Sequence, residues 1–144
     1  MGQTESYYDS KLDLDTDGSI YAGQDRTGQG ATALRYPGGR SVDANAVLYF
    51  VLPGLFYQAW RIRKGDLGAV FYRDHLAFAV FADVGPRHRI GEGSIALHRA
   101  LGHETIVNGR LRNVGIDRGV ITIVFPHSGD GTPQTPERIQ ALWG

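Results

Sequence analysis

Cysteine is absent from this chain of 144 residues, which excludes disulfide bonds, thiolate nucleophiles and cysteine-ligated zinc together. Long apolar runs are absent too. The two longest, 46–52 and 76–82, have seven residues each, against the roughly 20 that a membrane-spanning helix requires. The formal net charge is zero, which argues against a nucleic-acid binder that gains affinity by neutralising phosphates. We therefore expect a globular protein with neither a membrane nor a nucleic-acid partner.

Glycine and proline are abundant by comparison, and they divide the sequence into short elements. Twenty glycines and six prolines are spread along the whole length, which leaves little room for long helices. Alternating or continuous apolar residues predict five strands, at 11–15, 46–52, 67–72, 76–81 and 120–125. We find no repeat and no linker, so residues 1–144 are predicted to form one mainly β domain.

Two short helices are predicted from residues that are typical of helix ends. Ser94 can cap a helix that ends before Gly102, where a left-handed C-terminal cap belongs. Near the C-terminus, Thr135 as N-cap and Pro136 at the first helical position, followed by Glu137, predict the second helix. Both helices are expected to flank a closed or nearly closed β-barrel.

Two carboxylates stand on either side of a glycine-containing loop. Asp83 follows an apolar strand, and Glu92 comes just before the helix capped by Ser94. Glycoside hydrolysis needs one protonated carboxyl to donate to the leaving oxygen and one ionised carboxylate to activate water or attack the sugar. Desolvation raises a carboxyl pKa, so Asp83, after four apolar residues, is the expected acid and Glu92 the expected base. A turn or capping role for Asp83 is the alternative.

Several motifs in the same order resemble glycoside hydrolase family 75, the chitosanase family of fungi that is also represented in bacteria. The motifs cover nearly the whole chain: KLDLDTDGS at 11–19, VLPG at 51–54, GDLGAVFY at 65–72, FADVGPRHRIGEGSIALHRALG at 81–102 and GVITIVFPHSG at 119–129. The resemblance implies endo-hydrolysis of β-1,4-linked glucosamine chains with inversion, and Asp83 and Glu92 as the catalytic pair. Inversion requires the two carboxyls to stand roughly 6.5 to 9.5 Å apart.

The fold expectation comes from a second likeness. A strand that ends in an aspartate, a Gly-Pro loop, an acid followed by a small hydroxyl residue, and a helix that ends in Ala-Leu-Gly are similar to the pattern of double-psi β-barrels. That group includes family 45 endoglucanases and expansin-like proteins. By this analogy we expect a six-stranded double-psi-like β-barrel with short flanking helices.

Further residues are expected to bind substrate rather than a metal or cofactor. The resemblance implies that one of Asp15 and Asp17 lines the groove, with an Asp-Gly turn as the alternative for Asp17. His88 and Ser94 lie beside the carboxylates in sequence. The aspartates begin like a calcium loop, but Gln24 stands at the twelfth position, where a bidentate carboxylate is expected. The five histidines show no metal-ligand spacing. We therefore predict no metal and no cofactor.

The sequence does not identify which polymer is the substrate. Arg87 and Arg89 lie between the two carboxylates, and a cleft for polycationic chitosan should be acidic. The alternatives are a peptidoglycan hydrolase or antibacterial toxin on the same scaffold, and a non-catalytic polysaccharide-binding module. A monomer that acts on an extracellular glycan is expected, although the first ten residues have neither the basic nor the apolar region of a secretory signal.

Overall fold

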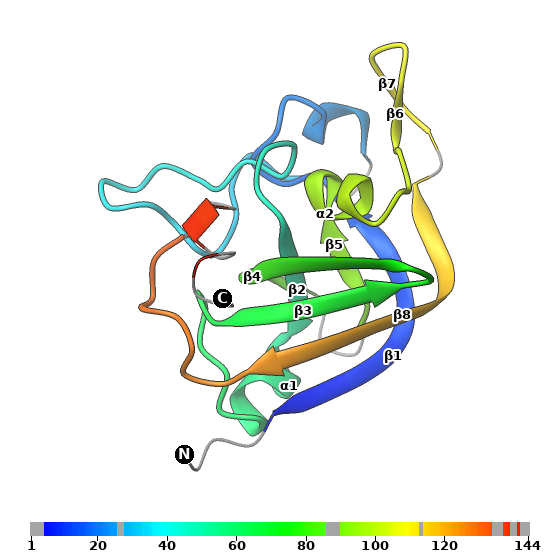
Figure 1. Ribbon diagram of the computed structural model, residues 1–144. Helices are drawn as coiled ribbons and strands as arrows, with labels where there is room; N and C mark the ends of the chain where they lie inside the picture. Colours follow the sequence, from blue (N-terminus) through cyan, green and yellow to red (C-terminus); the bar gives the residue numbers. More distant parts are fainter. Residues whose placement is uncertain are drawn as a thin grey trace.

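Six strands close into a barrel in the computed structural model, which describes residues 5–25, 28–85, 90–112, 114–133, 137–138 and 141 (Figure 1). The strand order around the barrel is β1-β5-β2-β4-β3-β8. Its strands are β1 Ser6–Asp15, β2 Tyr49–Pro53, β3 Leu67–Tyr72, β4 His75–Gly85, β5 Glu92–Ser94 and β8 Gly115–Phe125. The remaining elements are η1 Ala22–Gln24, α1 Gly54–Ala59, α2 Ile95–Ala100, β6 Ile106–Val107 and β7 Arg110–Leu111. The prediction of a mainly β, six-stranded barrel with short flanking helices is confirmed.

Most of the predicted elements are present. Four of the five predicted strands lie within β1, β3, β4 and β8, and α2 follows Ser94 as expected. The strand predicted at 46–52 instead begins at Tyr49, because the amides of Ala46 and Val47 donate to the carbonyl of Asp43 and close a turn there. The start of the predicted C-terminal helix, Thr135 and Pro136, lies outside the described residues.

Apolar side chains pack on both faces of the barrel wall. The interior holds a cluster that includes Leu12, Phe50 and Phe81, and the rings of Phe50 and Phe81 stack with centroids 6.0 Å apart. A second cluster lies outside, where the segment between β1 and β2 packs Leu34 and Val42 against β2 and β4. Large-to-small changes in such cores cost about 2 to 5 kcal/mol. The outer cluster therefore fixes this long segment over the ends of β1 and β4.

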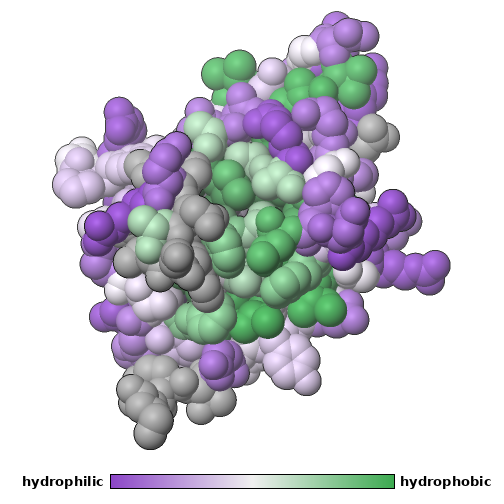
Figure 2. All heavy atoms as spheres, in the orientation of Figure 1, coloured by the Kyte–Doolittle hydropathy of each residue, from purple (hydrophilic) through white to green (hydrophobic). Residues whose placement is uncertain are grey.

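One outer face of the barrel remains apolar. Phe71 of β3 is in register with Leu76 of β4 and with Ile121 of β8, and these three side chains are exposed by 36%, 50% and 39%. Figure 2 shows apolar side chains gathered on this side of the molecule. Within the described residues, no helix is long and apolar enough to cross a membrane.

Candidate functional site

The barrel register brings Asp83 and Glu92 to one face of the sheet. Val51 of β2 pairs with Asp83 of β4 on one side and with Glu92 of β5 on the other. Neighbouring strands lie about 4.8 Å apart and paired residues share a face, so the Cα atoms of the two acids are about 10 Å apart. A Cβ built on Gly85 would lie 3.4 Å from Oε1 of Glu92, so the Glu92 carboxyl lies over the end of β4. The two predicted acids are thus near neighbours.

Glu92 begins a strand that the sequence did not reveal. β5 has three residues and lies between β1 and β2, with Glu92 opposite Asp13 and Ser94 opposite Asp15. The Gly93 between them has room for no side chain, since a Cβ there would lie 2.7 Å from Cδ2 of Leu97. The alternation directs Glu92 outward, where it is partly exposed.

Asp83 lies two residues before the end of β4 and is 6% exposed. Its Oδ1 accepts hydrogen bonds from the amides of Ala33 and Val84, each at 3.0 Å. Ala33 belongs to the segment packed outside the barrel, and the neighbouring amide of Leu34 donates to the carbonyl of Ala82 at 2.9 Å. The covering segment therefore both buries the Asp83 carboxyl and sets its orientation.

Two further carboxyls, those of Asp15 and Asp17, lie close to the Asp83 carboxyl. Single oxygen atoms of Asp15, Asp17 and Asp83 all lie within 4.8 Å of one another. Asp15 is 7% exposed, and its Oδ1 accepts from the amide of Asp17 at 2.8 Å and from the hydroxyl of Tyr49 at 3.0 Å. Asp17 is partly exposed, and its Oδ1 accepts from the amide of Gln29 at 2.7 Å. We call Asp15, Asp17 and Asp83 the carboxyl cluster.

The proton affinities in the carboxyl cluster are perturbed in the direction that general acid catalysis requires. Burial raises the pKa of Asp83 to about 9, and hydrogen bonds and charge from Asp17 and Asp15 add to the effect. Burial also raises the pKa of Asp15, with the charge of Asp17 contributing. Closely spaced carboxyls cannot all ionise, so one of them keeps a proton at neutral pH. With a pKa near 9, Asp83 is the member that carries it.

The spacing of the carboxyl cluster would also suit a cation. Metal ligation requires deprotonated carboxylates, so a cation and the shared proton would exclude each other at the carboxyl cluster.

Ser94 has a structural position, contrary to its expected contact with substrate. It is fully buried, and its hydroxyl accepts from the amides of Leu97 at 3.1 Å and Tyr49 at 3.0 Å while it donates to the carbonyl of Val47 at 2.7 Å. These bonds cap α2 and tie it to β2, and they use the hydroxyl fully. Ser94 therefore leaves the substrate-binding set. His88, with Arg87 and Arg89, lies outside the described residues.

The sequence did not single out Tyr49 as part of this arrangement. It lies in the apolar run 46–52, so it was indistinguishable from a core residue, and its ring does pack in the outer cluster. Its hydroxyl, however, reaches Asp15, which is 34 positions away in the chain. A buried tyrosine hydroxyl usually has a partner, but only the fold identifies which one.

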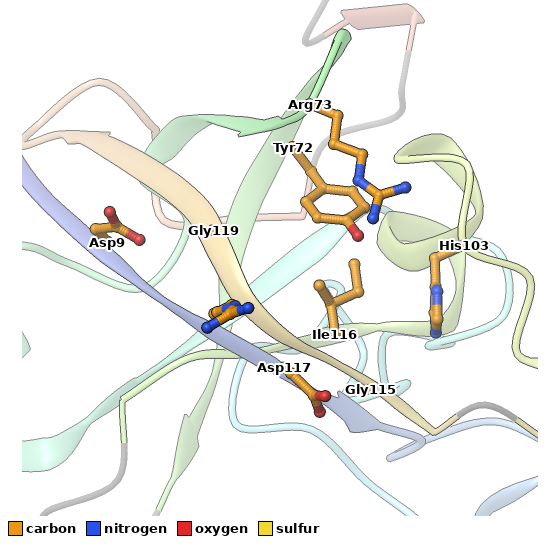
Figure 3. Close-up of a pocket in the computed structure, with 9 residues that line it drawn as sticks. Asp9, Tyr72, Arg73, His103, Gly115, Ile116, Asp117 and Gly119 are labelled. Atoms are coloured by element: carbon orange, nitrogen blue, oxygen red, sulfur yellow. The ribbon is translucent and has the colours of Figure 1, made fainter.

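A separate groove lies along β1 and β8, with a volume of about 860 Å³. Figure 3 shows Tyr72, Ile116 and His103 around its opening, from β3, β8 and the segment after α2. Its charged side chains, together with those of an adjoining hollow of about 420 Å³, are three acids and three bases: Asp9, Asp13, Asp117, Lys11, Arg73 and Arg118. The charges of this groove balance, whereas the carboxyl cluster contains acids alone.

One known protein family matches nearly the whole chain. The family described as fungal chitosanase of glycosyl hydrolase group 75 matches residues 12–143, a range that contains the carboxyl cluster and Glu92. No curated protein matches the chain at a significant level. Since the match covers nearly the whole chain, this protein belongs to glycosyl hydrolase group 75, the fungal chitosanase family.

Proposed function

We propose that this protein is an endo-acting, inverting glycoside hydrolase that cleaves a β-1,4-linked amino-sugar polymer of the chitosan type. Asp83 is its general acid and Glu92 its general base. The observation that carries the proposal is the contrast between the two carboxyls: burial raises the pKa of Asp83 to about 9, whereas Glu92 is partly exposed on the same face of the sheet. Different environments are what divide a pair of carboxyls into an acid and a base.

The reaction uses each carboxyl once. Asp83 donates its proton to the glycosidic oxygen, which leaves as an alcohol, while Glu92 removes a proton from a water that attacks the anomeric carbon from the opposite side. Backbone positions about 10 Å apart, with side chains on one face, are compatible with a carboxyl separation of roughly 6.5 to 9.5 Å. That separation leaves room for the water and predicts inversion.

The carboxyl cluster supports a cationic sugar as the substrate. Asp17 is its partly exposed member, and the described residues that perturb Asp83 and Asp15 are carboxyls and a tyrosine rather than bases. An ionised Asp17 would attract the ammonium group of a glucosamine unit and give no such advantage to a neutral acetamide. This favours chitosan over peptidoglycan. We propose that the enzyme meets this polymer outside the cell.

The test compares two variants with matched controls on two polymers. Asp83→Asn and Glu92→Gln should each lower kcat on chitosan by about 10² to 10⁴-fold, with or without EDTA, while both still bind it. Asp117→Asn and Glu5→Gln, which change exposed acids outside the site, should leave kcat unchanged. NMR of the first product should show the α-anomer. Full activity of either site variant ends the assignment, and soluble fragments from purified peptidoglycan sacculi but not from chitosan would transfer it to that polymer.

A further inference from the structure

Tyr49 is fixed at both its backbone and its hydroxyl. The side chain is fully buried, and the amide donates to Oγ of Ser94 at 3.0 Å. The hydroxyl lies 3.0 Å from Oδ1 of Asp15 and 3.4 Å from the carbonyl of Asp17. A phenol in this position can donate one proton, and the shorter bond directs that proton to the Asp15 carboxylate.

Asp83 and Asp15 each accept hydrogen bonds from two donors. Asp83 accepts from two amides, those of Ala33 and Val84. Asp15 accepts from the amide of Asp17 and from Tyr49. Each donor favours the ionised form of the carboxyl it contacts. Without Tyr49, Asp15 would have one donor against two on Asp83, and the shared proton would move toward Asp15.

We propose that Tyr49 is a positioning residue that keeps the shared proton on Asp83 by hydrogen bonding to Asp15. The inference rests on the proposed function, which assigns Asp83 as the acid. The titratable groups of the described chain that face Asp83 are Asp15 and Asp17, from the end of β1 and the segment after it, and Tyr49 from β2. Glu92 of β5 lies beyond Val51 in the same row.

Tyr49→Phe tests the proposal because it removes the hydroxyl and leaves the ring. A hydrogen bond to an ionised group is lost from Asp15, so its proton affinity rises and it takes a larger share of the one proton that it shares with Asp83. The plateau kcat should fall about tenfold, since fewer molecules hold the proton on Asp83, and KM should stay within about twofold. The alkaline limb of the kcat profile should move about one pH unit higher, because the two carboxyls together then bind the proton more tightly. Carbon-13 NMR of the Asp83 carboxyl should show a smaller protonated fraction at neutral pH without substrate.

Two matched variants separate this role from a purely structural one. Tyr8→Phe removes another buried hydroxyl, from the barrel interior, and should leave the plateau kcat and the alkaline limb unchanged. In Asp15→Asn, the carboxylate that Tyr49 contacts is gone, so adding Tyr49→Phe should produce no further loss of plateau kcat. Should Tyr49→Phe fail to fold, a fluorinated tyrosine at position 49 is a stronger donor and should draw the proton further toward Asp83, as measured by the carbon-13 signal of the Asp83 carboxyl.

The outcomes distinguish this inference from the proposed function. If the wild-type protein hydrolyses chitosan and neither the protonated fraction of Asp83 nor the plateau kcat falls in Tyr49→Phe, the role of Tyr49 is overturned. If the protonated fraction of Asp83 falls as expected but the wild-type protein hydrolyses no glycan, the proton placement stands and the proposed function fails.

Discussion

Replacing Asp83 by asparagine should lower kcat by about 10² to 10⁴-fold and stabilise the fold. The asparagine Oδ1 can keep both amide donors, Ala33 and Val84, and its amide group can donate to the carboxylates of Asp15 and Asp17. The variant is thus a permanent copy of the protonated acid. It lacks the ionised form, which is the form that burial and the neighbouring carboxyls disfavour.

The size of the effect follows from proton linkage. The pKa of Asp83 is raised from 3.8 to about 9, so between these values the folded protein holds a proton that the unfolded chain has released. The free energy of unfolding then falls as pH rises through this window, by up to about 1.4 kcal/mol per pH unit. At pH 7 the accumulated penalty is at most about 4 kcal/mol, and coupling within the carboxyl cluster spreads it over several groups. Asp83→Asn removes it.

Urea denaturation of both proteins between pH 4 and pH 9 measures the difference. The free energies of unfolding should nearly coincide at pH 4, below which the stabilisation by the bound proton is fully present, and should diverge in favour of Asp83→Asn as pH rises. Thermal unfolding should report the same order, at about 3 °C per kcal/mol for a chain of this size. A variant that is less stable at pH 7, or a difference that does not depend on pH, would refute the reasoning.

Two structural predictions concern hydrogen bonds that hold the barrel together. Ser94→Ala removes the hydrogen bond that caps α2 and two further hydrogen bonds. The free energy of unfolding should therefore fall by about 2 to 3 kcal/mol, and KM should not change. A raised KM with unchanged stability would instead support a role of Ser94 in substrate binding. Asp66 is 1% exposed and accepts from the amides of Arg63, His127 and Gly129. Asp66→Ala should therefore lower the free energy of unfolding by about 3 kcal/mol in urea denaturation, and a loss below about 1 kcal/mol would contradict this.

The elements that were predicted correctly carry local signals. β3 and β4 are joined by a tight turn, and their apolar residues lie within one short stretch. β5 has three residues, two of them glycine or serine, which is too short to show a period of two. α1 has six residues and begins directly after Pro53, so no helical stripe could form. Both were left unpredicted because neighbours distant in sequence stabilise them.

The candidate site was likewise predicted in part from the sequence. The positions of Asp83 and Glu92 could be predicted from the sequence because a strand end and a helix start flank them. Asp15 was expected to bind substrate, but the structure buries it against Asp83. The hydroxyl of Tyr49 contacts Asp15, which is 34 positions away in the chain, and the amide of Ala33 donates to Asp83, which is 50 positions away. No sequence pattern reports such pairs, since they depend on how the barrel closes.

The strand order has a consequence for biosynthesis. β1 is made first, yet its barrel partners are β5 and β8, and β8 begins roughly 100 residues later, which a ribosome adds in about 5 to 20 s. Until then the only barrel partner of β1 that has been made is the three-residue strand β5. Pairings of such long range also make folding slow, on the order of milliseconds to seconds after release. The nascent chain therefore waits with most of its first strand unpaired.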